Sequence, residues 1–356
     1  MKPTVRKGQA EVKLSKDEFV RRFAKLFFDP QFASVQQQID DVTEVAWSNY
    51  QAGHKAPRTV KAGPGFQDPQ YDLSIEWLEA RQRLELAEEK RKSGPSRILV
   101  ICGSPRNEHT CPSEESKTHR LVEKALAVIK QEAGFETDFL DLSRLTAEYG
   151  KVIHPCKACV STAMPLCHWP CSCYPNHGLG QAPDWMNDIY EQWMAAHGVM
   201  ILTPVHWYQA PTVLKLMMDR LVCADGGNAD PTSTQGKDPL LAKEMELKGW
   251  DYPKHLAGRA FSVVVHGDSA GTENLRRILI DWLTDMKLIP AGASSQIGEY
   301  IGYYKPYATS HEDLDEDQDL FKEVENAATS LVNQIRLIRS GHFTAPDENL
   351  KDPRQK

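Results

Sequence analysis

Hydrophobic and polar positions change their spacing about a quarter of the way along the chain. Before that point apolar side chains recur at helical spacing, and the pattern predicts helices over 16–28, 32–51 and 74–92. The stretch HKAPRTVKAGPGFQDP between the last two is rich in Pro and Gly and predicts a break. Because SGPS at 93–96 is typical of a linker, we expect residues 1–95 to form a helical extension.

From Arg97 onward, short apolar runs alternate with amphipathic stretches. The expected strands are 97–103, 135–142, 198–204, 258–267 and 287–293, and the expected helices are 116–133, 183–197, 211–223, 271–285 and 315–339. Strands that alternate with helices of this length predict a parallel sheet covered on both faces. Residues 96–340 therefore suit an α/β fold, a flavodoxin-like doubly wound five-stranded sheet that binds its ligand at the carboxyl ends of the strands. We expect 341–356 to be a flexible tail.

Composition and charge exclude several classes of protein. The 356 residues are 41% hydrophobic and 26% charged, as in ordinary globular proteins, and the net charge of −7 argues against a nucleic-acid binder. No apolar run approaches the ~20 residues that span a bilayer, and the N-terminal sequence lacks the apolar core of a secretory signal. We expect a cytoplasmic protein whose partners include neither nucleic acid nor membrane.

The loop after the first expected strand, GSPRNEHTCPSEESKTHRL, carries candidate phosphate ligands. It leads into a helix N-terminus, where backbone N–H groups and the helix dipole favour an anion. The hydroxyls of Ser104, Ser116 and Thr118 can donate hydrogen bonds, and Arg106 or Lys117 can neutralise charge. The loop matches neither a Walker loop nor the G-x-G-x-x-G of a dinucleotide site. An ordinary capped helix with a long polar loop is the alternative.

The loops after the third and fourth expected strands raise two further possibilities. In TPVHWYQAP, Trp207 and Tyr208 could flank a planar aromatic ligand. In VVVHGDSAGTENL, the segment GDSAG matches the nucleophile elbow of hydrolases, which makes Ser269 a candidate nucleophile. The chain shows no HGGG-type oxyanion loop well upstream, and little sequence remains downstream for the acid and base of a triad. We therefore expect that Ser269 is not a nucleophile, and an esterase is the less favoured alternative.

Three stretches together resemble the NADPH-dependent FMN reductase family of flavodoxin-like oxidoreductases, over about residues 97–293. The first loop matches through Gly103-Ser104-Pro105-Arg106 and Lys117-Thr118-His119-Arg120-Leu121. The third-strand segment matches through Thr203-Pro204-Val205-His206-Trp207-Tyr208, then Lys215 and Asp219-Arg220, with His206 where tyrosine is usual. The first loop is longer than usual in the family and contains Cys111.

The resemblance implies an enzyme that binds FMN and uses NAD(P)H as co-substrate. The first loop would hold the FMN phosphate, and the loops after strands three and four would line the isoalloxazine. The implied cofactor-binding residues are Ser104, Arg106, Ser116, Lys117, Thr118, Pro204, Val205, His206, Trp207, Tyr208, Gly267, Asp268, Ser269 and Gly271. Electrons would pass to a quinone, nitroaromatic, azo compound, metal ion or free flavin. Family members usually complete the substrate pocket at a subunit interface, which implies a homodimer or homotetramer.

Five cysteines, Cys156, Cys159, Cys167, Cys171 and Cys173, gather between the second strand and the next helix. The first two form C-x-x-C, which can place two thiolates on one metal. Iron–sulfur flavoproteins, relatives with the same fold, carry a compact four-cysteine motif here, but Thr162 occupies its third position. An iron–sulfur cluster, a zinc or redox-thiol site, and loop thiols that only pack all remain open. The first would make the protein an iron–sulfur flavoprotein electron carrier.

Overall fold

The structure is a computed structural model. It describes residues 2–4, 13–107, 116–267, 270–301, 306–346 and 350. The chain forms two compact units, each built from three stretches: unit 1 is Met1–Arg83, Gly150–Asn187 and Arg220–Pro253, and unit 2 is Leu84–Tyr149, Asp188–Asp219 and Lys254–Lys356. Neither unit coincides with 1–95 or with 96–340, so the expected division at those boundaries stays a prediction.

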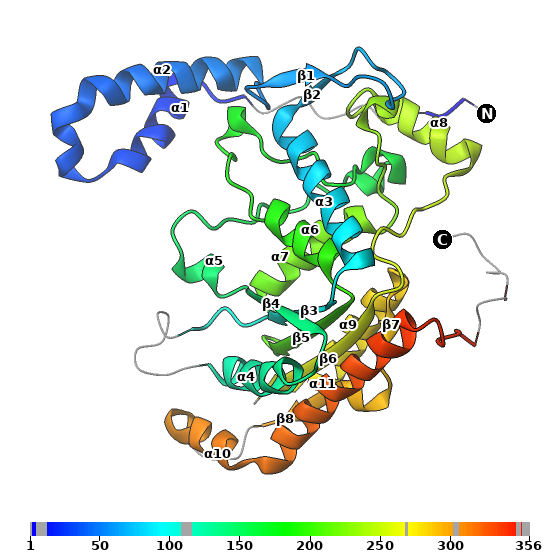
Figure 1. Cartoon of the computed structure of the whole chain (residues 1–356). Helices are drawn as coiled ribbons and strands as arrows, with labels where there is room; N and C mark the ends of the chain where they lie inside the picture. The colour runs from blue at the N-terminus through cyan, green and yellow to red at the C-terminus, as the bar shows by residue number, and fades with distance from the viewer. Residues whose placement is uncertain are drawn as a thin grey trace. The chain divides into compact units, whose positions relative to one another are not determined.

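Unit 2 contains the parallel sheet (Figure 1). Its strands are β3 (Ser96–Cys102), β4 (Phe135–Asp141), β5 (Gly198–Pro204), β6 (Ala260–Gly267), β7 (Ile289–Pro290) and β8 (Gln296–Tyr300). They follow the order β4-β3-β5-β6-β7, with β8 also paired to β6, and every pairing is parallel. This is the order of a flavodoxin-like doubly wound sheet, which confirms the predicted fold class.

The edge of the sheet differs in detail from the expected strand over 287–293. Only Ile289 and Pro290 pair with the start of β6, and the chain rejoins β6 further along as β8. Proline has no backbone N–H to continue a ladder, and Gly292 adopts a φ of 97°, which turns the chain away. One expected strand is therefore replaced by two short ones.

Helices cover both faces of this sheet because its central strands are apolar on both sides. On one face, α4 (Lys117–Lys130) and α11 (Gln318–Arg339) share a core with β3, β5 and β6. A Cβ added at Gly198 would lie 2.6 Å from Ile335 of α11, so the helix approaches the strand closely there. α9 (Thr272–Asp285) packs on β6 and β8, and its Trp282 meets Trp193 of α6 (Met186–Ala195) with ring centroids 6.1 Å apart. The remaining helices of unit 2 are α5 (Arg144–Ala147) and α10 (Ser310–Glu316), and α7 (Thr212–Arg220) lies almost wholly within it.

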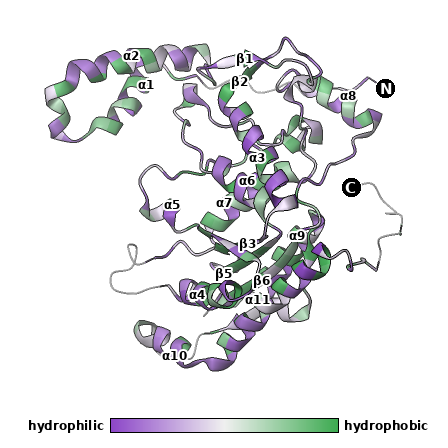
Figure 2. Ribbon diagram, in the orientation of Figure 1, coloured by the Kyte–Doolittle hydropathy of each residue, from purple (hydrophilic) through white to green (hydrophobic). Residues whose placement is uncertain are grey.

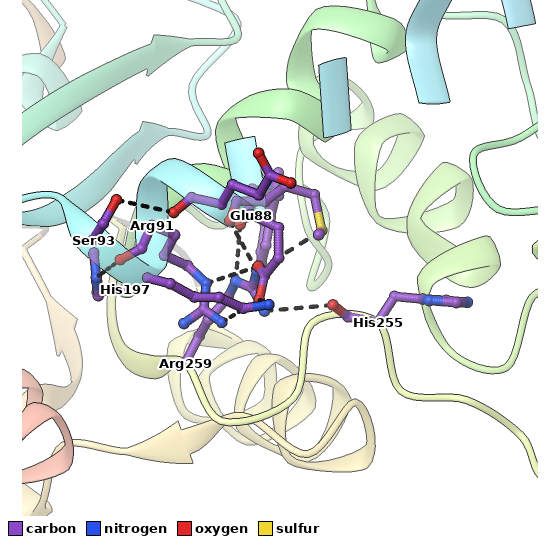
Figure 3. A network of polar contacts seen from close by, with 10 residues as sticks. Glu88, Arg91, Ser93, His197, His255 and Arg259 are labelled. Atoms are coloured by element: carbon purple, nitrogen blue, oxygen red, sulfur yellow. Dashed lines mark hydrogen bonds and ion pairs between the residues drawn. The ribbon is translucent and has the colours of Figure 1, made fainter. Parts of the chain in front are cut away.

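A buried arginine joins α3 (Ile75–Ser93) to the start of β6 within unit 2 (Figure 3). Arg259 is 1% exposed and donates to the carbonyls of Trp193 and Met194 at 3.0 and 2.9 Å. Its guanidinium also lies 3.1 Å from the carboxylate of Glu88, which binds Arg91 on the same helix. Burial lowers the pKa of Arg259 to about 10. The ion pair and the two carbonyls together compensate a charge that would otherwise be costly to bury.

Unit 1 contains the N-terminal helices α1 (Lys16–Phe23) and α2 (Gln36–Ala52), which form where the apolar pattern predicts them. Phe19 packs on Trp47 and Tyr50, with ring centroids 5.4 and 5.1 Å apart. The Pro- and Gly-rich stretch lies within a small antiparallel hairpin of β1 (Thr59–Lys61) and β2 (Asp72–Ser74). Figure 2 shows that hydrophilic and hydrophobic residues alternate along α1 and α2, as the pattern requires.

The later stretches of unit 1 are joined by a buried ion pair. Arg220 and Asp184 are each 1% exposed and lie 2.7 Å apart, and Arg220 also donates to the carbonyl of His154 at 2.9 Å. Helix α8 (Pro239–Gly249) belongs to the last of these stretches. In the part of the chain that the structure describes, no helix combines the length and the apolar character needed to cross a bilayer.

Candidate functional site

A pocket of about 110 Å³ lies in unit 2, lined by residues that follow the carboxyl ends of β3, β5 and β6. Its lining residues are Ser104, Arg106, Ser116, Lys117, Thr118, Pro204, Val205, His206, His266, Gly267, Ile301 and Ser310. In a doubly wound sheet these strand ends form the crevice where ligands bind. The volume is small and most of the side chains are polar, so the pocket suits a small charged group.

The N-terminus of α4 supplies one wall of this pocket. Ser116 caps the helix by accepting a hydrogen bond from the His119 N–H at 3.1 Å. Lys117, the first helical residue, donates to Ser310 Oγ at 2.7 Å. A capped helix N-terminus beside a lysine and several hydroxyls presents partial and full positive charge to the same small volume. That arrangement favours an anion such as a phosphate.

His266, near the end of β6, is a lining residue that sequence analysis did not select. It is 3% exposed, and its Nε2 lies 2.9 Å from Thr118 Oγ1. Burial, with a smaller contribution from the charge of Lys117, lowers the pKa of His266 to about 3, so the ring is neutral at physiological pH. Its buried Nδ1 has no hydrogen-bond partner among the described residues. A buried ring nitrogen without a partner at the wall of a pocket indicates that a ligand completes its hydrogen bonding.

The loop after β5 makes a tight two-residue turn. The His206 N–H donates to the Gln209 carbonyl and the Gln209 N–H to the His206 carbonyl, both at 3.0 Å. Trp207 and Tyr208 occupy the centre of the turn with φ of 47° and 65°, the left-handed pair that such turns require. Their side chains are 92% and 59% exposed and do not line the pocket. The two aromatic rings are therefore presented outside it.

Close approaches hold the loops of the site together. The Val205 N–H donates to the His266 carbonyl at 2.9 Å, which joins the loop after β5 to the end of β6. A Cβ added at Gly271 would lie 3.0 Å from Tyr208 Cα, and Gly271 has a φ of 115°. A Cβ at Gly103 would lie 2.7 Å from Thr203 Oγ1. Glycine is thus required at both positions for these loops to pack.

Nine of the fourteen residues expected to bind the cofactor line this one pocket. They are Ser104, Arg106, Ser116, Lys117, Thr118, Pro204, Val205, His206 and Gly267. Trp207, Tyr208 and Gly271 lie outside its lining, and Asp268 and Ser269 fall outside the described residues. The candidate nucleophile therefore has no described geometry, and cofactor binding by all fourteen residues stays a prediction.

Besides His266, Ile301 and Ser310 line the pocket and were not expected there. Both follow the last strand of the sheet, in a segment that carries no phosphate-binding pattern. The only signal in the sequence was for His266, which directly precedes the GDSAG segment.

The lining residues fit FMN at its phosphate end. Hydroxyl donors, a lysine, an arginine and a helix N-terminus match the chemistry of a phosphate. The unpaired Nδ1 of His266 adds a hydrogen-bonding position in the same wall.

The cysteine cluster belongs to unit 1, and within it Cys173 contacts both Cys159 and Cys171. Cys159 Sγ lies 3.7 Å from Cys173 Sγ and 3.6 Å from Lys237 Nζ. The contact with Cys173, together with the charge of Lys237, lowers the pKa of Cys159 to about 6. Burial raises the pKa of Cys167, and both the contact with Cys173 and burial raise that of Cys171.

The expected metal site at these cysteines is not supported. Within the described residues, which include all five of them, no three His, Cys, Asp or Glu side chains are grouped so that they could hold a metal ion. Close spacing in the sequence therefore does not bring the five thiols together as one set of metal ligands.

Comparison with known proteins gives consistent matches. The model of the family described as NADPH-dependent FMN reductase matches residues 96–299. The chain is similar to the iron–sulfur flavoprotein of Methanosarcina thermophila, at 28% identity over 204 residues that cover 57% of this chain and 80% of the relative. Among solved structures it is similar to RosB with the bound intermediate 8-demethyl-8-formylriboflavin-5'-phosphate, at 14% identity and a TM-score of 0.50, over 70% of this chain and 82% of the other. A structure of an FMN-dependent NADH-azoreductase from Bacillus anthracis in complex with FMN matches at 18% identity and a TM-score of 0.36, over 67% and 100% of the two chains.

Proposed function

Since this chain belongs to the NADPH-dependent FMN reductase family, and is thus an NAD(P)H-dependent flavin oxidoreductase, we propose that the pocket at the ends of β3, β5 and β6 binds the phosphate of FMN. The observation that carries the proposal is the juxtaposition of the α4 N-terminus, Lys117 and the half-satisfied ring of His266 around one small volume. Bound FMN would supply the redox chemistry, accepting a hydride from NAD(P)H and passing electrons to an acceptor.

The chain's own residues contribute binding and position. The N–H groups at the start of α4 and the Lys117 ammonium neutralise the phosphate charge. The Ser104 hydroxyl donates a hydrogen bond to its oxygens, while the Thr118 hydroxyl donates to His266 Nε2 and so leaves the Nδ1–H of that ring for the phosphate. Hydride transfer itself requires no side-chain acid or base, so none is assigned to the reaction. His206, which lines the pocket, remains a candidate donor to the acceptor.

The exposed rings of Trp207 and Tyr208 suit the binding of a planar ligand next to the phosphate pocket. A tight turn fixes both backbones, and the rings stand outside the phosphate pocket. Planar rings held in this way can flank the isoalloxazine or an aromatic acceptor by stacking. We therefore propose planar acceptors, such as quinones, nitroaromatics, azo compounds or free flavin, ahead of metal ions. The co-substrate is NADH or NADPH, the assembly a homodimer or homotetramer, and the location cytoplasmic.

An iron–sulfur electron carrier is the alternative function, because the chain is similar to the iron–sulfur flavoprotein of Methanosarcina thermophila. The contact between Cys159 and Cys173 is the observation in its favour, and the lack of a third converging ligand among the described residues is the observation against it. A flavin reductase and an iron–sulfur electron carrier differ in visible spectrum and in metal content.

The visible spectrum of freshly purified protein tests the proposal, recorded before and after anaerobic addition of NADPH and then NADH, with iron and zinc assayed on the same sample. We expect two flavin bands that bleach with a nicotinamide and no stoichiometric metal. A broad iron–sulfur shoulder with stoichiometric iron would establish the alternative. A colourless protein that does not take up added FMN would contradict both functions.

A further inference from the structure

Unit 1 contains a cavity of about 530 Å³ that the proposed flavin chemistry does not use. Its walls come from the segment after α2, the β1–β2 hairpin, the start of α3, and the loops around 168–175 and 231–237, all of which belong to unit 1. The volume falls in the range of pockets that hold small organic ligands, roughly 300–1,000 Å³.

Two lysines, Lys55 and Lys237, line this cavity and give it positive charge. Lys55 donates to the main-chain carbonyl of Ser172, and Lys237 donates to that of Leu166 at 2.8 Å. Within the described residues neither ammonium forms an ion pair with a carboxylate. Burial lowers the pKa of Lys55, and the nearby Cys173 and Cys171 sulfurs act in the opposite direction. The Lys237 ammonium lies 3.6 Å from the Cys159 sulfur; burial acts against its charge, but the nearby Cys173 and Cys159 thiols raise its pKa.

The other charged and titratable groups of the lining do not neutralise the lysines. Asp72 is exposed and pairs with Lys61 at 2.9 Å. His168 is neutral because burial lowers its pKa well below the usual value, and both its nitrogens contact hydroxyls, of Ser172 and Thr234. The remaining ionisable groups in the lining are His54, Tyr71 and Tyr174. The net charge of the lining is therefore positive.

Apolar and aromatic side chains form another part of the cavity lining. Leu73, Trp77 and Tyr174 line the cavity and are 4%, 5% and 4% exposed. The indole N–H of Trp77 donates to the Pro170 carbonyl and the Tyr174 hydroxyl to the Pro155 carbonyl, both at 2.8 Å. Because their polar atoms are already bonded to the main chain, these rings add no unpaired polar atom to the lining. The Tyr174 ring also stacks on His154, with centroids 4.8 Å apart, and lies 4.6 Å from the Arg220 guanidinium. The cavity thus has both apolar side chains and two lysine ammonium groups in its lining.

We propose that this cavity is a binding site for an organic anion, with a planar apolar body against Leu73, Trp77 and Tyr174 and a carboxylate or sulfonate between Lys55 and Lys237. Apolar burial supplies affinity, and charge-assisted hydrogen bonds to the two ammonium groups select for the anion. The inference does not depend on the flavin site, since every residue in it belongs to unit 1.

Isothermal titration calorimetry of the full chain with 2-naphthoate and with 2-naphthamide tests the proposal. The two probes share a ring system and differ in charge, so the comparison needs no variant. We expect naphthoate to bind about tenfold more tightly or better, because hydrogen bonds to charged groups are the stronger ones. Equal binding of the two probes, or binding of neither, overturns the proposal.

Variants then locate the binding. Lys55→Met and Lys237→Met should each weaken the binding of naphthoate about tenfold and leave the binding of naphthamide unchanged. Lys55→Arg should bind naphthoate as tightly as the wild type does. Lys243→Met is the matched control, a half-buried lysine of the same unit that does not line the cavity and donates to the Thr4 carbonyl. Thermal unfolding of each variant checks that it folds. Naphthoate binding that survives both Met substitutions overturns the assignment to this cavity, as does stoichiometric iron or zinc bound to the cysteines, which would supply the anion for Lys237.

Discussion

The Nε2 atom of His266 lies 2.9 Å from Thr118 Oγ1, so the end of β6 and the first turn of α4 are joined through two buried side chains. The contact brings together residues 148 positions apart in the sequence at the wall of the phosphate pocket. It also fixes the ring of His266 so that Nδ1 is the nitrogen left for a ligand.

Replacing His266 by Phe should therefore affect both folding and FMN binding. We expect the free energy of unfolding to fall by about 1–3 kcal/mol, because the Thr118 hydroxyl is left buried without its partner. The affinity for FMN should fall about tenfold. Urea unfolding of the flavin-free protein and a fluorescence titration with FMN measure the two effects. His342→Phe, at an exposed histidine, is the control, and equal behaviour of the two variants would contradict the role given to His266.

Lys117→Met should weaken FMN binding by about tenfold or more and leave riboflavin binding nearly unchanged. The ammonium interacts with the phosphate, which riboflavin lacks, and a charge-assisted hydrogen bond contributes roughly 1.5–3 kcal/mol. Titrations of wild type and variant with both flavins give the comparison. Lys130→Met, in the last turn of the same helix, should change neither affinity. An equal loss of affinity for FMN and for riboflavin would show that Lys117 does not bind the phosphate.

Stability should decrease on mild acidification because two histidines are buried in neutral form. Folding lowers the pKa of His266 to about 3 and that of His197 to about 4, chiefly by burial, against roughly 6.5 in an unfolded chain. Below about pH 6.5 the unfolded state binds more protons than the folded state, so the stability that is complete above that pH is lost as the pH falls towards 4 and then 3.

The urea midpoint measured at pH 7.5, 6 and 5 should fall in that order. His197 accepts a hydrogen bond from the Arg97 N–H and donates to the Arg91 carbonyl, so Gln is the closest uncharged replacement. In His197→Gln the decline between pH 6.5 and 5 should become shallower. A decline as steep as that of the wild type would show that other groups cause it.

Removing Glu88 should cost more than removing Arg259. In Glu88→Ala the buried guanidinium keeps its carbonyl partners and loses its counter-charge, and we expect a loss of about 2–3 kcal/mol. Arg259→Met removes the buried charge itself and leaves Glu88 paired with Arg91, so no uncompensated charge stays buried and the loss should be smaller. Chemical unfolding ranks the variants. Glu89→Ala, an exposed neighbour on α3, serves as control, and the reverse order of losses would refute the argument.

The sheet of unit 2 was predictable because its signal is local. β3 is an unbroken apolar run with small and polar residues after it, and the alternation with helices fixes parallel pairing. The phosphate residues followed from the sheet, because parallel strands bring their carboxyl ends to one edge. Lys117 and Val205 could thus be placed together without any knowledge of their contacts.

Other features depend on contacts between distant segments and left no local pattern. Ser310 lines the pocket and accepts a hydrogen bond from Lys117, 193 residues away in the sequence. The importance of His266 arises from its burial, which an alternating or apolar pattern cannot distinguish from that of its neighbours. For the cysteines, the spacing suggested convergence, but side-chain direction is set by the packing of the whole loop, and within the described residues no three of the thiols are grouped as metal ligands.

Unit 1 is assembled from three stretches of chain that end at Arg83, Asn187 and Pro253. During synthesis its first stretch therefore leaves the ribosome well before the partners against which it packs. At roughly 5–20 residues per second, the wait until Pro253 is added lasts about 10–30 s. Throughout that interval Leu73 and Trp77, buried in the finished unit, lack their final neighbours. The nascent chain, more than the folded protein, is the form in which this fold is exposed to aggregation and to chaperones.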